Sequence, residues 1–174
     1  KIVQSIQRTA QEAGIEIVTG DTKVVERGKA DQLFINTAGI GELLQPLALS
    51  PQRIQPGDAI VVSNDIGRHG IAVLASREGI NLDVDLQSDM ALLHPLIQAL
   101  LHNGIDLHCA RDLTRGGLGG ALLELAEQGG RDLRVVETAV PVSDTVQAAC
   151  ELLGFDPLFV GELLATGLSL SRLR

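Results

Sequence analysis

The chain has 174 residues, a formal net charge of −8 at pH 7, and 45% hydrophobic but only 2% aromatic residues. This length fits one domain or two small ones, with a core of Leu, Ile, Val and Ala because Trp and Tyr are absent. The negative charge and the shortage of aromatic rings argue against nucleic acid and anionic membranes as partners, and no apolar run approaches the roughly 18 residues that cross a bilayer.

The two cysteines indicate an intracellular protein. Cys109 and Cys150 lie far apart without a paired motif, so we expect reduced thiols. No signal-peptide pattern opens the chain, which together with the thiols predicts a cytoplasmic location. Lys1 stands where an initiator Met is expected, and the chain begins inside a predicted helix, so we expect the chain to be a fragment.

The first part of the chain predicts one helix, two strands and a linker. Apolar residues recur at helical spacing over residues 1–13, and Gly14 ends that helix. Its apolar face consists of Ile2, Ile6, Ala10 and Ala13. Short apolar runs predict strands at 15–18 and 33–38. The pattern weakens over 41–57, which contains three prolines, so we expect a domain boundary between Leu43 and Gly57.

The second part alternates between strands and helices. Buried or extended runs predict strands at 59–63, 107–110 and 133–136. Helical patterns cover 68–79, 90–103, 117–128 and a segment that Ser143 caps and that ends at Leu153. This alternation predicts an α/β or α+β layered fold.

Two loops have the composition of an anion-binding site. The run 111–120, Arg-Asp-Leu-Thr-Arg-Gly-Gly-Leu-Gly-Gly, opens a strong helix, and a helix start offers free N–H groups and partial positive charge. Thr19-Gly20-Asp21-Thr22-Lys23-Val24 offers a similar set after a short apolar run. Two such loops indicate a phosphorylated ligand, although glycine in either loop also serves a tight turn.

Six motifs in one order carry a family resemblance. They are Gly20-Asp21-Thr22-Lys23-Val24-Val25, Phe34-Ile35-Asn36-Thr37-Ala38-Gly39, Pro56-Gly57-Asp58, Asp65-Ile66-Gly67-Arg68-His69-Gly70, Arg111-Asp112-Leu113-Thr114-Arg115-Gly116-Gly117 and Cys150-Glu151-Leu152-Leu153-Gly154. Together they closely resemble the HypE family of hydrogenase expression/formation proteins. That family belongs to the superfamily of aminoimidazole-ribonucleotide synthetase and selenophosphate synthetase.

The resemblance implies a fold and an activity. Residues 1–45 would be the second half of an N-terminal ATP-binding α/β domain, and 55–174 a truncated C-terminal α/β domain. The family is a carbamoyl dehydratase that uses ATP and magnesium to convert a carbamoyl group on its C-terminal cysteine into a thiocyanate, for the cyanide ligands of [NiFe]-hydrogenase. The resemblance also implies a homodimer and partners among the hydrogenase maturation proteins, namely a carbamoyltransferase and iron-site scaffold proteins.

The family's functional residues carry over to matching positions. Asp21 would hold magnesium or the triphosphate, and Thr22 and Lys23 would contact phosphate, with Lys23 also counted as catalytic. His69 would line the cleft and transfer protons. The opposing loop would consist of Asp112, Thr114, Gly116 and Gly117.

Other positions depart from the family pattern or lack a clear role. Arg68 stands where the family carries aspartate, which inverts a charge at the cleft. Glu162 is a shifted remnant of a family glutamate or stands at the following position, and no tail cysteine is present, so we expect no complete reaction from this chain alone. His94, His102 and His108 lack metal-ligand spacing, and Asp83, Asp85 and Asp89 predict an acidic surface run.

Two other functions fit the same residues. One is a non-catalytic assembly module that binds maturation partners or its own copy. The other is a different ATP-dependent enzyme of the same superfamily, acting on selenium or thiamine phosphate. Binding of ATP with magnesium separates the enzymes from the assembly module.

Overall fold

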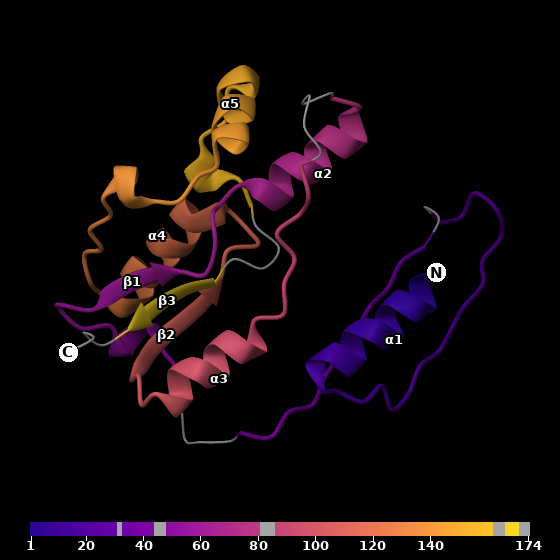
Figure 1. Ribbon diagram of the computed structural model, residues 1–174, viewed down its shortest axis with the longest axis horizontal. Coiled ribbons are helices and arrows are strands. Elements are labelled where there is room, and N and C mark those ends of the chain that lie inside the picture. The colour runs from indigo at the N-terminus through magenta and orange to yellow at the C-terminus, as the bar shows by residue number, and fades with distance from the viewer. Residues whose placement is uncertain (31–32, 44–47, 81–85, 162–165, 171–174) are drawn as a thin grey trace. The chain divides into compact units, whose positions relative to one another are not determined.

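The chain forms two compact units in the computed structural model, which describes residues 1–30, 33–43, 48–80, 86–161 and 166–170 (Figure 1). Unit 1 is Lys1–Pro46 and unit 2 is Leu47–Arg174. The division falls within the proline-containing segment 41–57.

Unit 1 contains the predicted first helix. Helix α1 spans Ile2–Ala13 and ends at Gly14, whose φ of 65° is in the left-handed region that glycine adopts without strain. The predicted strands at 15–18 and 33–38 are wrong, because the structure assigns no strand to either run. A strand needs a hydrogen-bonded neighbour, and the apolar side chains there remain exposed, with Val18 at 85% and Phe34 at 72%.

Unit 2 is built on a three-stranded antiparallel sheet. Its strands are β1 (Ala59–Val62), β2 (Leu107–Asp112) and β3 (Thr166–Leu170), in the order β1-β3-β2. The apolar pattern predicted strands at β1 and at the start of β2, but no strand at 166–170. The central strand, β3, therefore comes from a segment in which the sequence pattern predicted neither a strand nor a helix.

The helices of unit 2 lie where the sequence predicts them. They are α2 (Arg68–Glu78), α3 (His94–His102), α4 (Gly117–Gly129) and α5 (Asp144–Leu153), with 3-10 turns η1 (Pro51–Arg53), η2 (Glu137–Ala139) and η3 (Pro157–Phe159). Helix α3 begins at His94 rather than at the predicted residue 90, because Pro95 is tolerated only in the first turn.

Two predictions in the second half of unit 2 are corrected. Residues 133–136 form no strand, and Val136 is 56% exposed. Ser143 stands at the N-cap of α5, as predicted, but its side chain makes no capping hydrogen bond. Its buried Oγ has no hydrogen-bond partner among the described residues.

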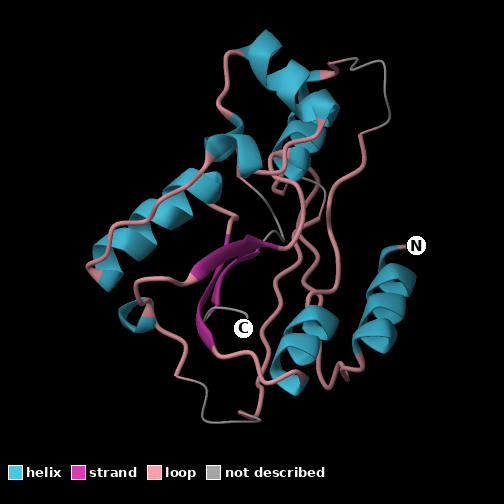
Figure 2. Cartoon of the chain, turned by 60° about the vertical axis from the view of Figure 1, so that its left-hand side comes forward, coloured by secondary structure: helices cyan, strands magenta, loops and turns pink. Residues whose placement is uncertain are grey.

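Helices cover both faces of the sheet around β2 (Figure 2). Leu107 packs against the α3 side chains of Ile97, Leu100 and Leu101. Cys109 packs against Leu125 of α4 and Ile54. At the C-terminal end of β2, Leu113 packs in a buried cluster with Leu118 and Ala121 of α4. Helix α2 packs on α5 through Ile71 and Val146. The core thus fixes the loop between β2 and α4, where the sequence placed a site.

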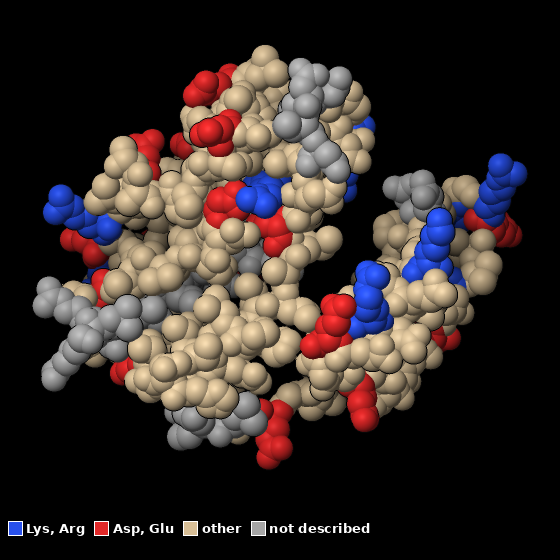
Figure 3. All heavy atoms as spheres, in the orientation of Figure 1, with Lys and Arg blue, Asp and Glu red and all other residues tan. Residues whose placement is uncertain are grey.

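The described helices are all too short or too polar to cross a membrane. On the face shown in Figure 3, basic and acidic side chains of the described residues are scattered rather than gathered into one basic surface. In the whole sequence acidic residues outnumber basic ones, with 22 Asp and Glu against 14 Lys and Arg.

Candidate functional site

The loop between β2 and α4 is held from both ends. Strand β2 ends at Asp112, the next residue, Leu113, is fully buried, and α4 begins at Gly117. Gly116 and Gly117 both have positive φ, at 73° and 62°, and this left-handed turn redirects the chain from the strand into the helix. The polar side chains of Asp112 and Thr114 therefore project from a fixed turn.

The glycines at the start of α4 also have a packing role. A Cβ atom at Gly117 would lie 2.6 Å from the carbonyl oxygen of Leu158 and 2.7 Å from that of Val160. One at Gly119 would lie 2.7 Å from the ring of Phe159. The segment around η3 thus approaches α4 at distances that only glycine permits, which is a structural reason for the glycine-rich run independent of any ligand.

Asp112 is the best-defined acidic group of this loop. A side-chain hydrogen bond from Thr114 is the main cause that lowers the pKa of Asp112, with the positive charge of Arg111 adding to it. The Arg111 guanidinium donates to Asp112 Oδ1 and, from the other side, to Glu124 Oε2 of α4 at 2.9 Å. Because the Asp112 side chain is 56% exposed, its carboxylate is ionised and accessible. The structure brings Asp112 and Thr114 into contact within this loop, and their role in binding a ligand stays a prediction.

Replacing Thr114 with alanine should raise the pKa of Asp112 toward its usual range. The hydroxyl stabilises the ionised form, so its loss favours the proton. A carboxyl-detected NMR titration measures this shift, and Thr114→Ser, which keeps the hydroxyl, should leave the pKa low. Since the folded-state pKa is depressed, the stability this group contributes is present above the unfolded pKa and is lost as pH falls through the folded one. Equal titration of the alanine and serine variants would contradict the role of the hydroxyl.

His69 lies in the first turn of α2, far along the chain from this loop. Its Nδ1 is 2.9 Å from the Ser88 hydroxyl, and the ring is half-buried. Arg68 beside it donates to Asp65 Oδ2 from Nε at 3.1 Å. The Arg68 guanidinium therefore forms an ion pair with the neighbouring Asp65 carboxylate.

The prediction that Asp83, Asp85 and Asp89 form an acidic surface run is wrong for Asp89. Asp89 is only 8% exposed, and neither carboxylate oxygen has a hydrogen-bond partner among the described residues. Asp83 and Asp85 lie outside the described residues, as does Glu162. Its low exposure places the Asp89 side chain in the interior rather than on a solvated surface. The preceding residue, Ser88, is the hydrogen-bond partner of His69.

The first predicted loop lies in unit 1. Asp21 Oδ1 accepts the backbone N–H of the next residue, Thr22, at 2.8 Å, and Asp21, Thr22 and Lys23 are all exposed. Asp112, Thr114 and His69 belong to unit 2. The convergence of the two sets on one cleft stays a prediction.

Unit 2 also contains an apolar cavity of about 890 Å³. It lies between β1, α4 and residues 131–141, with Ile60, Val62, Leu118, Leu122 and Val140 in its wall. Arg111 reaches its edge, but Asp112, Thr114 and His69 do not line it. Residues 133–136, which were predicted to form a strand, are part of the wall of this cavity.

Two sets of polar contacts in unit 2 were not predicted from the sequence. The pairing of Arg111 with Glu124 joins residues thirteen apart, and a network around His108 joins residues fifty apart. For the network around His108, the sequence offered only the closeness of Asp106 and His108, which are two residues apart and do not have the spacing of a metal-ligand motif. Over the residues that the structure describes, His, Cys, Asp and Glu form no group of three or more that could hold a metal ion.

Comparison with known proteins gives consistent matches along the chain. The AIR synthase related protein N-terminal domain matches residues 1–43 and the C-terminal domain of the same family matches 55–163. Carbamoyl dehydratase HypE of Azotobacter vinelandii is 49% identical over 168 residues, which is 95% of this chain and 49% of that protein. The chain spans about half the length of the curated relatives it matches.

Two solved structures are similar over nearly the whole chain. The structure of hydrogenase maturation protein HypE in complex with ATP has a TM-score of 0.93 and 45% identity, covering 98% of this chain and 51% of that one. A HypE-HypF complex gives a TM-score of 0.92 and 40% identity, covering 98% of this chain and 56% of that one.

Proposed function

Because this chain belongs to the AIR synthase related protein family, and within it to the HypE group, we propose that it is part of an ATP-dependent carbamoyl dehydratase of hydrogenase maturation. The observation that carries the proposal is the loop from Arg111 to Gly117. It presents an ionised, accessible carboxylate beside a hydroxyl at the start of a 13-residue helix.

The proposed reaction removes water from a cysteine thiocarbamate. The carbamoyl oxygen attacks the γ-phosphorus of ATP, and the bond from that phosphorus to the bridging oxygen of ADP breaks. The C–O bond to the new phosphate then breaks, both nitrogen protons leave, and a C≡N group remains on the sulfur. ATP thus turns a poor leaving group into phosphate, while the protein must position the phosphates and accept protons.

Chain residues supply these roles in the proposal. Asp21 would hold magnesium, which commonly takes one or two carboxylates together with substrate phosphates, and Asp112 would contact the nucleotide from the opposing loop. Thr22 and Lys23 contact phosphate, and Thr114, Gly116 and Gly117 form the opposing loop. When bound, the ion would neutralise charge on the phosphates.

We assign proton transfer to His69, together with Lys23. If the His69 Nδ1–H donates to the Ser88 hydroxyl, Nε2 carries the lone pair and can accept a proton from the carbamoyl nitrogen. Ser88 then fixes both the ring orientation and the tautomer. The half-buried position of His69 keeps the ring ordered while leaving part of it accessible.

The proposed partners follow from the same relatives. A HypE has been solved together with HypF, and we extend this to other maturation proteins, including the carbamoyltransferase and iron-site scaffold proteins. A homodimer in the cytoplasm completes the proposal. An assembly module without catalysis would keep these partners but would not bind ATP.

Calorimetry with ATP and magnesium tests the proposal on the full-length protein. We expect binding, and we expect Lys23→Met to weaken it about tenfold to a hundredfold, because a hydrogen bond to a charged group contributes about 1.5–3 kcal/mol. Lys29→Met is the matched control, since Lys29 is an exposed lysine of the same unit. The absence of ATP binding to the full-length protein would favour the assembly module, and equal weakening by both variants would remove the specific role of Lys23.

A further inference from the structure

Helix α3 ends at an asparagine–glycine pair that hydrogen bonds hold in a closed turn. Asn103 directly follows the helix, with a φ of −84° and a ψ of 7°, and Gly104 has a φ of 69°, in the left-handed region. The Gly104 N–H donates to the Leu101 carbonyl at 3.0 Å. The Ile105 N–H donates to the Leu100 carbonyl, also at 3.0 Å. These two bonds form the Schellman motif, which satisfies the last carbonyls of a helix.

The Asn103 side chain closes the same turn. Its Nδ2 donates to the Ala99 carbonyl at 2.8 Å, and its backbone N–H donates to that carbonyl at 3.1 Å. Asn103 and Gly104 are nevertheless both exposed. Water therefore reaches the pair, while the backbone around it is fixed.

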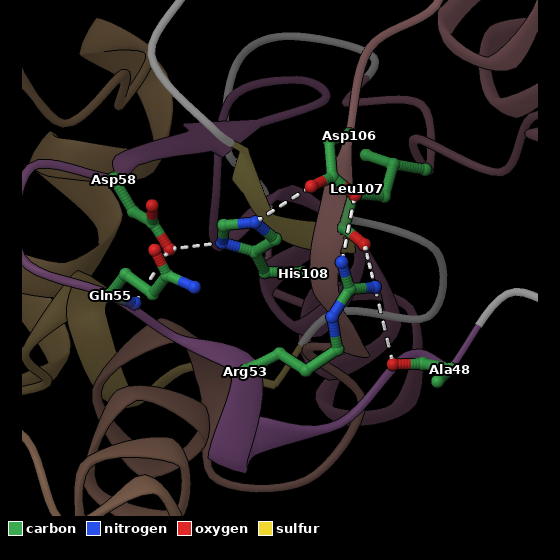
Figure 4. A network of polar contacts seen from close by, with 7 residues as sticks. All are labelled: Ala48, Arg53, Gln55, Asp58, Asp106, Leu107 and His108. Carbon is green, nitrogen blue, oxygen red and sulfur yellow. Dashed lines mark hydrogen bonds and ion pairs between the residues drawn. The ribbon is translucent and has the colours of Figure 1, made fainter.

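The chain beyond this turn is anchored to the sheet. Ile105 packs against the buried Leu107 of β2. Asp106 accepts a hydrogen bond from Arg53 at 2.8 Å and lies 3.1 Å from the ring of His108, which occupies a β-bulge in β2 (Figure 4). Opening of the turn must therefore begin on the helix side, at the last turn of α3.

We propose that the Asn103–Gly104 bond is a site of spontaneous deamidation, and that the last turn of α3 controls its rate. The Gly104 nitrogen attacks the Asn103 Cγ, and the bond from Cγ to Nδ2 breaks. The Gly104 proton leaves with that amide group as ammonia, and a five-membered succinimide remains. Water then opens the ring at either carbonyl, which gives aspartate or isoaspartate. Glycine favours ring closure because it has no Cβ that hinders the approach.

The closed turn opposes ring closure in three ways. The attacking Gly104 nitrogen carries a proton that is bound to the Leu101 carbonyl, and the Asn103 Nδ2 is bound to the Ala99 carbonyl. The ψ of 7° at Asn103 must also change before the Gly104 nitrogen can face Cγ. The rate in the folded protein is therefore the rate in an open chain multiplied by the fraction of time that the turn is open.

Deamidation would weaken the end of α3. A carboxylate at position 103 has no N–H to donate to the Ala99 carbonyl, and its negative charge is unfavourable at a helix C-terminus. Isoaspartate also lengthens the backbone by one carbon, which disrupts the bonds of Gly104 and Ile105. Leu107 would then lose part of the cover that α3 provides.

Mass spectrometry of the full-length protein tests the proposal. Native and urea-unfolded samples are aged in mildly alkaline buffer and digested with trypsin, and the exposed Asn36, which precedes Thr37, is the internal reference. In urea we expect Asn103 to convert at least about ten times faster than Asn36. In the native protein its conversion should be at least about tenfold slower than in urea. Conversion in urea no faster than that of Asn36, or equal native and urea rates, would overturn the proposal.

Two leucine variants of α3 test the control by the turn. Leu101 packs against Leu107, whereas Leu96 of the same helix is 38% exposed. Leu101→Ala should raise the native rate about tenfold, because lost packing favours the open turn, and should leave the rate in urea unchanged. Leu96→Ala, the matched control, should leave both rates within about a factor of three. Equal native rates in the two variants would overturn the control by the packed turn.

Discussion

Replacing Asp112 with alanine in the full-length protein should lower ATP turnover about a hundredfold, the scale seen when a carboxylate of a metal or phosphate site is lost. The free energy of unfolding should change by no more than about 1 kcal/mol, because exposed ion pairs contribute little. The Asp112 carboxylate is 56% exposed, and the groups that contact it among the described residues are the side chains of Arg111 and Thr114. Phosphate release and chemical denaturation measure the two effects separately.

Glu124→Gln is the matched control for this substitution. Glu124 is the other carboxylate bound to Arg111, at 2.9 Å, and is 50% exposed. It lies on α4 rather than in the loop, so its loss should leave turnover within about a factor of three, in the range of a surface substitution below about 0.7 kcal/mol. Equal losses of turnover in both variants would show that the orientation of Arg111, rather than the Asp112 carboxylate, supports the reaction.

The sequence predicted helices better than strands, for a physical reason. A helix satisfies its backbone hydrogen bonds within one segment, so the spacing of apolar residues and the glycines that follow, Gly14 and Gly104, were enough to find α1 and α3, although the start of α3 was predicted too early. A strand is defined by its neighbour. The apolar runs at 15–18 and 133–136 find no partner strand among the described residues, whereas the run at 166–170, which contains Thr, Gly and Ser, pairs on both sides.

The candidate site shows the same division between local and long-range information. The carboxylate and hydroxyl of Asp112 and Thr114 were predictable because two residues in one turn stay close in any fold. The burial of Asp89 and the enclosure of His108 were not, since each depends on segments distant in the chain. A β-bulge in particular changes which face a side chain occupies without changing the sequence pattern.

Gly117→Ala should destabilise the protein by roughly 2–5 kcal/mol, of which about 1–2 kcal/mol comes from the left-handed backbone and about 1–3 kcal/mol from overlap. The φ of Gly117 is 62°, and an added Cβ would lie 2.6 Å from the Leu158 carbonyl oxygen. Backbone atoms on both sides make relief difficult, so η3 must move away from α4. Denaturant unfolding of the variant measures the loss.

Gly130→Ala separates the two causes. Gly130 ends α4 with a φ of 60°, and an added Cβ would meet no atom within 4 Å, so only the backbone cost of about 1–2 kcal/mol applies. If both variants lost the same stability, the close approach of η3 to α4 would not be a constraint on the fold. If Gly117→Ala is the more damaging, a loss of ATP binding in that variant reports a displaced loop. The contribution of the loop to the ligand must then be judged from Asp112→Ala, which leaves the packing intact.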